Sequence, residues 1–271
     1  MAVDRAAVDS ARGVALIAEF DQGRVAFVRG LSAESAVTVQ EIAGALARPD
    51  RIVLSPGATA AALYSPELGQ VQSITGLKAE IKVNEAALVT DLGPVTAITV
   101  DDAGTILIAA PGGIHALRAG SAAVLVAQAQ DPAAIVIWRD GFVYADRAAN
   151  EIVAASTRDE FPELTVIAQE RDGIASPAGL AVMGGRLLVA VTGSLVFWDL
   201  ETGMKAYEIP SPAQPTTLRH LGGAVSLNDP GDQPLWLVEP GLAGLGLAEL
   251  GLAETDEQAP RVRFVPAAAR Q

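Results

Sequence analysis

The chain has 271 residues, of which 50% are hydrophobic and 19% are charged, and it contains no cysteine. This composition excludes an intrinsically disordered chain, a disulfide-stapled fold and thiolate or sulfur-ligated metal chemistry. The formal net charge of −13 argues against nucleic-acid binding, and no apolar run is long enough to cross a membrane.

Short apolar runs recur along the chain, at residues 14–20, 60–65, 106–111, 142–146, 187–192 and 235–239. Each is too short for a helix and is bounded by Gly, Pro, Asp or Ser, so each predicts a β-strand. Another strand and a polar turn precede each run, and the preceding strands read AAVD, RIVL, AITV, AIVI, GLAV and AVSL. Because the runs are continuously apolar rather than alternating, we expect strands covered on both faces.

The spacing of these runs predicts the fold. The runs recur about every 44 residues, which is typical of a propeller blade with four strands. We therefore predict an all-β chain that forms one domain over residues 1–271, a six-bladed β-propeller of four-stranded antiparallel blades. The blades are expected at approximately 4–43, 51–91, 95–129, 133–170, 177–210 and 216–267.

The last blade has two interpretations. In the first, AVSL (224–227) is the innermost strand, LWLVE (235–239) the second, 242–260 a distorted third strand and loop, and RVRFVP (261–266) the fourth. In the second, TTLRHL (216–221) is innermost and RVRFVP joins the first blade. The two interpretations close the ring differently, and the sequence leaves both open.

One repeat, GFVYADRAANEIVAAS (141–156), carries a family signature. Ala145, Asp146, Asn150 and Ile152 stand where an NHL-type repeat has a strand ending in Ala-Asp, a turn, then Asn and an Ile-containing strand. The repeat resembles the NHL type, with a turn one residue longer than usual. Two further segments, ALYSPELGQVQSI and VAVTGSLVFWDLETG, resemble related propeller hairpins, while the other blades lack the Asp and Asn pair. The resemblance implies the six-bladed β-propeller superfamily and no particular member.

A ligand site is predicted at one mouth of the channel. In an antiparallel blade, the second-to-third turn and the crossing to the next blade lie at the same end, where propellers often bind ligands. The polar residues on these loops are Arg51, Asp91, Asp131, Asp146, Arg147, Asn150, Asp172 and Glu239. Carboxylates with a few arginines suit a polar, cationic or sugar-like ligand, or a divalent cation. The simpler alternative is that Asp146 and Asn150 cap their own hairpin and the others are solvated loop charges.

Other polar and aromatic residues are expected to have structural roles. Asp101 and Asp102 lie in a first-to-second strand turn at the opposite end, where Asp usually bonds to backbone amides of the turn. Trp138 and Trp198 fall within strands, which favours packing between blades over a sugar-stacking surface. Neither histidine has partners at the spacing of a catalytic triad.

We therefore predict a non-catalytic propeller that binds a ligand or a protein, or acts as a scaffold, through its mouth loops. No catalytic residue and no cofactor is expected, with Ca²⁺ as the one ion that the loop carboxylates would suit. The alternative is a calcium-dependent hydrolase of the six-bladed lactonase type, for which the apolar first strands offer few ligands. The expected partner is a small polar molecule or a protein, with no nucleic acid and no membrane insertion, and the chain is expected to be a monomer.

The compartment is left open by the sequence. The absence of cysteine fits a cytoplasmic protein, and it fits a periplasmic or extracellular one whose leader has been removed. A further hypothesis is that the chain was cut from a longer polypeptide, because it begins almost directly at a strand and ends in VPAAARQ.

Overall fold

The structure is a computed structural model that describes residues 6–19, 22–31, 35–156, 162–183, 185–210, 217–220, 225–228, 235–239 and 261–265. Within these ranges the secondary structure is β-strand, apart from two short 3₁₀ turns, η2 (Thr90–Leu92) and η3 (Glu170–Asp172). No helix in the described part of the chain is long and apolar enough to span a membrane. The predicted all-β class is therefore confirmed.

The described strands form six antiparallel sheets, each made from consecutive strands. Sheet 1 contains β1 (Ala6–Asp9), β2 (Val14–Glu19), β3 (Arg24–Arg29) and β4 (Thr38–Glu41); sheet 2 contains β5 (Arg51–Leu54), β6 (Ala60–Ser65), β7 (Gln70–Thr75), β8 (Lys82–Val83) and β9 (Ala87–Leu88); sheet 3 contains β10 (Ala97–Val100), β11 (Ile106–Ala110), β12 (Gly112–Leu117) and β13 (Val124–Ala129). Sheet 4 contains β14 (Pro132–Trp138), β15 (Gly141–Asp146), β16 (Glu151–Ser156) and β17 (Leu164–Gln169); sheet 5 contains β18 (Gly179–Met183), β19 (Arg186–Val191), β20 (Ser194–Asp199) and β21 (Met204–Pro210); sheet 6 contains β22 (Thr217–His220), β23 (Val225–Asn228), β24 (Leu235–Glu239) and β25 (Arg261–Val265).

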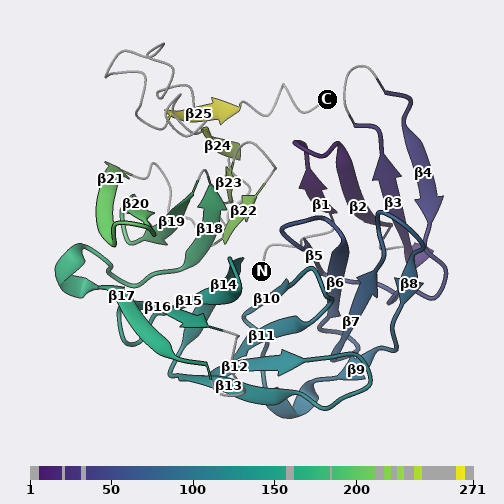
Figure 1. Cartoon of the computed structure of the whole chain (residues 1–271), viewed down its shortest axis with the longest axis horizontal. Helices are drawn as coiled ribbons and strands as arrows, with labels where there is room; N and C mark the ends of the chain where they lie inside the picture. Colours follow the sequence, from purple (N-terminus) through teal and green to yellow (C-terminus); the bar gives the residue numbers. More distant parts are fainter. Residues whose placement is uncertain are drawn as a thin grey trace.

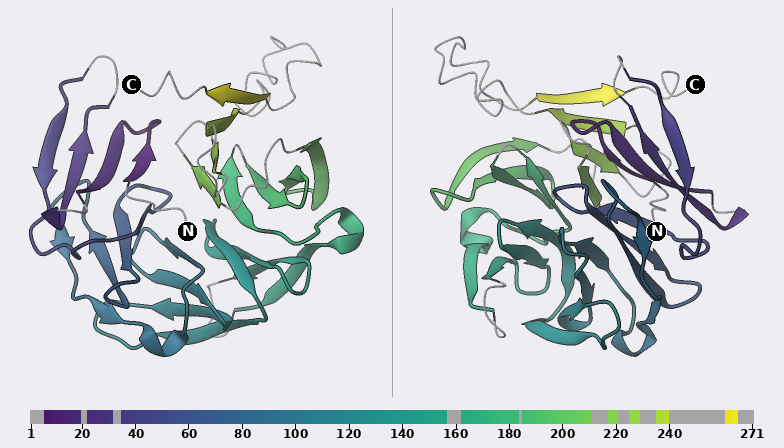
Figure 2. Two further views of the ribbon diagram at one scale, coloured as in Figure 1. Left: turned by 180° about the vertical axis from the view of Figure 1, so that it is seen from behind. Right: turned by 45° about the vertical axis from the view of Figure 1, so that its right-hand side comes forward.

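Four strands per sheet is the rule, as the sequence predicts, and sheet 2 is the exception. There the outer position is divided between β8 and β9, which both pair with β7. The sheets follow one another around a common centre with their first strands innermost (Figure 1). The first strands also contact one another in chain order, β1 with β5, β5 with β10, and so on to β18 with β22. The view from behind shows the same radial order (Figure 2).

Apolar side chains fill the spaces between successive sheets, which explains the continuous apolarity of the runs. In β6, all six residues are buried, and its alanines face the sheets on either side. Larger side chains fill the next spaces: Phe142 lies between sheets 3 and 4, and Trp198 lies between sheets 4 and 5. Sheets 2 to 5 are thus covered on both faces by their neighbours, as in stacked repeats.

The strand assignment of sheet 6 differs from both interpretations of the sequence. TLRH is the innermost strand β22, VSLN is the second strand β23, and LWLVE is the third rather than the second. RVRFV pairs with LWLVE as the fourth strand, so it does not join sheet 1. The first interpretation was wrong because it sought an apolar first strand, whereas TLRH is largely polar. The second interpretation has the correct innermost strand, but it was wrong to assign RVRFVP to the first blade. The segment 242–260 lies outside the described residues.

The close approach of sheets 5 and 6 depends on a glycine. A Cβ atom on Gly179 would lie 3.1 Å from Leu218 Cγ and 3.3 Å from the Leu218 backbone nitrogen. Glycine therefore lets β22 approach β18, where a side chain would push it away.

Candidate functional site: a central cavity lined by the innermost strands

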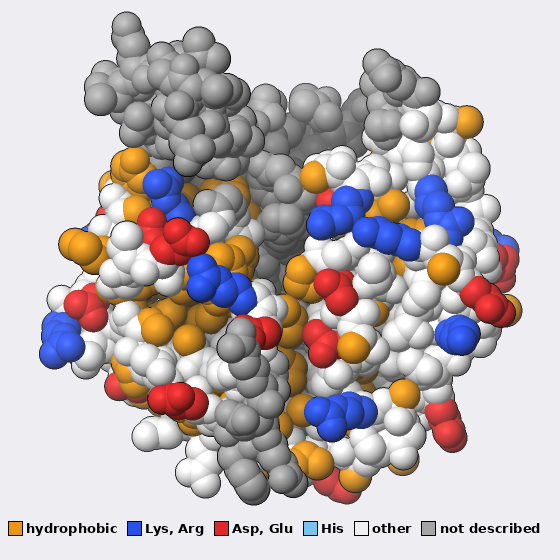
Figure 3. Space-filling model, viewed as in Figure 1, with side chains coloured by type: hydrophobic (Ala, Val, Ile, Leu, Met, Phe, Trp, Pro, Cys, Tyr) orange, Lys and Arg blue, Asp and Glu red, His pale blue; other side chains and the backbone are white. Residues whose placement is uncertain are grey.

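A cavity of about 1630 Å³ lies among the first strands. Residues of β1, β5, β10, β14 and β18 line it, together with Leu218 of β22. The space-filling view shows hydrophobic side chains on both sides of the central hollow, with acidic and basic side chains around them (Figure 3). The volume of the cavity exceeds the roughly 300–1,000 Å³ of common small-molecule sites, so a small ligand and accompanying water would fit.

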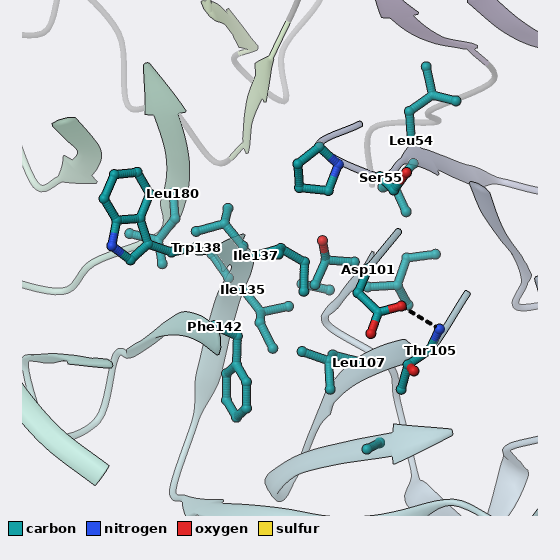
Figure 4. A pocket seen from close by; sticks show the side chains of 18 of the residues that line it. Leu54, Ser55, Asp101, Thr105, Leu107, Ile135, Ile137, Trp138, Phe142 and Leu180 are labelled. Atoms are coloured by element: carbon teal, nitrogen blue, oxygen red, sulfur yellow. Dashed lines mark hydrogen bonds between the residues drawn. The ribbon is translucent and has the colours of Figure 1, made fainter. Parts of the chain in front are cut away.

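The walls of the cavity are mostly aliphatic. Sticks in Figure 4 show Leu54, Ile135 and Ile137 around the pocket, with Trp138 beside Leu180. Trp138 also packs against the apolar cluster between sheets 4 and 5. The predicted packing role of this tryptophan is therefore present, although part of the side chain lines the cavity.

The neighbouring strands β5 and β10 run in the same direction, which gives the cavity two distinct ends. At one end, Nη1 of Arg51, the first residue of β5, donates to the carbonyl of Thr96, just before β10. At the other end, Asp102, just after β10, accepts hydrogen bonds from Gly57 N and Thr59 Oγ1, both at 2.8 Å. We name these the Arg51 end and the Asp102 end.

The Arg51 end holds a half-buried cation. Burial lowers the pKa of Arg51, against the opposing effect of Tyr64 and Asp50. Tyr64 stands opposite Arg51 in the β5–β6 pairing, and burial raises the pKa of its hydroxyl. Thr96 continues the bonding to the next sheet, because its Oγ1 donates to the Pro132 carbonyl at 2.5 Å. This end therefore ties sheets 2, 3 and 4 together.

The Asp102 end carries several carboxylates that already have partners. Asp9 accepts from Nη1 of Arg12 at 2.5 Å, and Asp101 accepts from the backbone N–H groups of Ala103 and Thr105 at 3.0 and 2.7 Å. Asp101 is thus a turn residue, as the sequence predicts. Asp102 instead bonds to the loop of the neighbouring sheet, a role that the sequence analysis missed.

We expect the stability contribution of Asp102 to depend on pH. Partial burial raises its pKa, but hydrogen bonds from Ser55, Thr59 and Gly57 outweigh this effect, so the net pKa is lowered. A carboxyl whose folded-state pKa is depressed stabilises fully above its unfolded value, about 3.9, and loses that contribution as the pH falls through the lower folded value. Because the side chain is exposed, Asp102→Asn should lower the free energy of unfolding at pH 7 by less than about 1 kcal/mol.

Urea denaturation of wild type and Asp102→Asn at pH 7 and pH 3 measures this difference. The two stabilities should approach each other at pH 3. Asp91→Asn serves as the control, since Asp91 is exposed in η2 and makes no hydrogen bond within the described residues. A difference of the same size at both pH values would contradict the role of the Asp102 carboxylate.

Four of the predicted site residues lie together on sheet 4 and its crossing. Asp131 and Arg147 form a two-bond ion pair, with N···O distances of 2.7 and 3.1 Å. Asp146 is 5% exposed and accepts four backbone N–H bonds, two within its hairpin and two from the preceding crossing. Asn150, at φ 57°, accepts from Ser176 N at 2.8 Å and so joins sheet 4 to the segment before β18. These bonds match the simpler alternative for Asp146 and extend it for Asn150.

The remaining predicted residues are separated. Asp91 is exposed in η2, and Asp172, the last residue of η3, accepts at 3.0 Å from the backbone nitrogen of Gln169, which precedes η3. Glu239 ends β24, but its side chain lies outside the described residues. Among the predicted residues whose side chains are described, Arg51 alone lines the cavity. The described part of the chain contains no group of three or more His, Asp or Glu side chains arranged to hold a metal ion.

Comparison with known proteins defines the fold. The sequence matches no protein family model and no curated protein. Its structure is similar to a functionally unknown protein from Desulfotomaculum acetoxidans DSM 771, at 13% identity over 88% of this chain and 82% of that one, with a TM-score of 0.58. It is also similar to a chain in the crystal structure of a nidogen–laminin complex, at 14% identity over 77% of this chain and 80% of that one, with a TM-score of 0.52.

The fold is β-propeller-like. At these identities the likeness concerns the fold alone, and neither match identifies a ligand. The cavity must therefore be interpreted from this chain's own residues.

Proposed function

We propose that the protein is a six-bladed, NHL-like β-propeller that binds a small molecule in its central cavity. Six sheets in chain order, with first strands in contact from β1 to β22, support the blade number. The hydrogen bonds of Asp146 and Asn150 support the NHL-like assignment of the fourth blade, because this pair holds the hairpin and its connection to the next sheet.

The cavity itself is the observation that carries the proposal. An apolar cavity with a few polar groups at its ends is the usual form of a small-molecule site. Binding rather than catalysis is proposed because Asp9, Asp101 and Asp102 are each engaged in bonds that hold turns or neighbouring loops. The cavity walls, rather than the mouth loops alone, then provide most of the contact with the ligand.

A neutral fluorescent probe, N-phenyl-1-naphthylamine, tests this proposal. Ile137→Glu places a carboxylate on the half-buried cavity wall and should weaken probe binding at least about tenfold, since it removes apolar contact and adds a charge that must be desolvated. The control is Val39→Glu on β4, where Val39 is 68% exposed and outside the cavity. Absence of probe binding to wild type, or equal losses in both variants, would contradict the proposal.

The alternative function, a calcium-dependent hydrolase, leads to different predictions for this protein. It requires Ca²⁺ to raise the melting temperature and to support hydrolysis of a lactone or ester panel. We expect neither effect. A calcium-dependent rise in melting temperature together with hydrolysis would replace the binding module with the hydrolase.

A further inference from the structure

Arg51 has hydrogen-bonding capacity that the described residues do not use. A guanidinium carries five N–H donors, and the bond to the Thr96 carbonyl occupies one of them. Within the described residues, no carboxylate lies within ion-pair distance of Arg51, although Asp50 is its neighbour in sequence. Half-buried cations normally pair with an anion, because removal from water is costly. A ligand can supply that anion.

The charges around the cavity favour an anion at the Arg51 end over the Asp102 end. At the Asp102 end, Asp9 is the last residue of β1, and Asp101 and Asp102 follow β10. These carboxylates would repel a further negative charge there. Two arginines also line that end: Arg139 is engaged by Glu201 at 3.1 Å and by the Trp138 ring, and Arg118 is exposed, so it offsets only part of the negative charge of the three carboxylates. The two ends are separated by the length of β5, roughly 13 Å for four residues.

Between the two ends the wall is mainly apolar, and Thr99 of β10 is the polar residue among the lining residues of β5, β10 and β14 there. Val53 of sheet 2 and Ile137 of sheet 4 line the cavity with partly buried side chains, while Ile98 of sheet 3 is 5% exposed and packs in the core between sheets 2 and 3. A ligand that reached from the Arg51 end into the cavity would therefore place its polar group on Arg51 and its remaining atoms on hydrocarbon. Arginine suits a carboxylate in particular, because its planar donors match the two carboxylate oxygens.

We propose that the cavity binds a medium-chain carboxylate, whose carboxylate is held by Arg51 and whose alkyl chain packs on Val53 and Ile137. The inference rests on the proposed function, since it specifies the ligand of the same cavity. A bound carboxylate would also offset the loss of hydration that lowers the pKa of Arg51.

Isothermal titration calorimetry with octanoate and octan-1-ol tests the charge preference separately from cavity binding. The two probes share an alkyl chain and differ in the charged head. Wild type should bind octanoate about ten- to a hundredfold more tightly than octan-1-ol, the range of one or two charge-assisted hydrogen bonds. Octylammonium should not compete with octanoate.

Variants then assign the preference to Arg51. Arg51→Gln should bind both probes about equally, with octan-1-ol affinity unchanged, while Arg51→Lys should retain part of the preference. Arg24→Gln is the charge-matched control, since Arg24 lies outside the cavity and pairs with Glu19 at 2.5 Å. Melting curves verify that each variant folds. If Arg51→Gln does not fold, a weaker preference of Arg51→Lys for octanoate over octan-1-ol supports the role of Arg51, and an unchanged preference contradicts it.

The outcomes separate the two proposals. Equal binding of octanoate and octan-1-ol by wild type, or an unchanged preference in Arg51→Gln, would overturn the carboxylate inference and leave cavity binding intact. If none of the three probes and no N-phenyl-1-naphthylamine binds, the proposed function itself fails.

Discussion

Replacement of Phe142 by alanine is expected to lower the free energy of unfolding by about 3–5 kcal/mol, the range for a buried phenylalanine. Phe142 is 1% exposed and packs with Leu107 and Ile135 between sheets 3 and 4. The same ring borders the central cavity (Figure 4). Removing it deletes contacts with both sheets and leaves space that the surrounding strands can only partly close. Urea denaturation followed by circular dichroism measures the loss.

Leu164→Ala is the matched control for Phe142→Ala. Leu164 lies in the same sheet but is 44% exposed, so its truncation should cost less than about 1 kcal/mol. Phe142→Leu should fall between the two variants. Binding of the neutral probe to folded Phe142→Ala should persist, because the cavity becomes larger and stays apolar. Equal destabilisation by the phenylalanine and leucine truncations would show that the space between sheets 3 and 4 is not a packed core.

Asp146→Ala is expected to cost about 1–3 kcal/mol, because it removes a buried carboxylate that accepts from four backbone N–H groups, three of them on exposed residues that water can reach. The carboxylate of this residue accepts from Gln130 at 2.7 Å, Asp131 at 3.1 Å, Ala148 at 3.2 Å and Ala149 at 3.3 Å. Asp146→Asn should be less damaging than the alanine variant, because one oxygen remains to accept. The amide nitrogen that replaces the other oxygen, however, would face a backbone N–H group that now donates to that oxygen.

Asp91→Ala provides the comparison for this carboxylate. Asp91 is another residue of the predicted mouth, but it is exposed, and its loss should change the free energy of unfolding by no more than about 0.5 kcal/mol. Equilibrium urea denaturation of the two variants, with circular dichroism as the signal, measures both values. If Asp146→Ala were as stable as Asp91→Ala, the bonds of Asp146 would contribute nothing to the fold.

The strands were predictable where both faces of a strand are buried. The runs at 60–65 and 106–111 coincide with β6 and β11, because packing between two sheets demands apolar residues at every position. The same rule failed for sheet 6. Its innermost strand, TLRH, has a single apolar residue, and the apolar run LWLVE lies one strand further out than predicted.

The site was less predictable than the strands. Sequence patterns place a charged residue on a turn, but they do not show which turns of different sheets approach each other. Asp102 illustrates the difficulty, because its partners Gly57 and Thr59 are 45 and 43 residues away. The apolar first strands are visible in the sequence and argue against calcium ligands, but they do not indicate a cavity. Their spacing around the centre depends on sheet twist and packing, which a single sequence does not specify.

The bonds between sheets 2 and 3 bear on how a molecule reaches the cavity. Arg51 fastens the seam between β5 and β10 at one extremity, and Asp102 fastens it at the other. While both hydrogen bonds persist, β5 and β10 stay together, so a solute is not expected to pass between sheets 2 and 3. A bound molecule is then expected to leave the cavity by a route other than the space between β5 and β10.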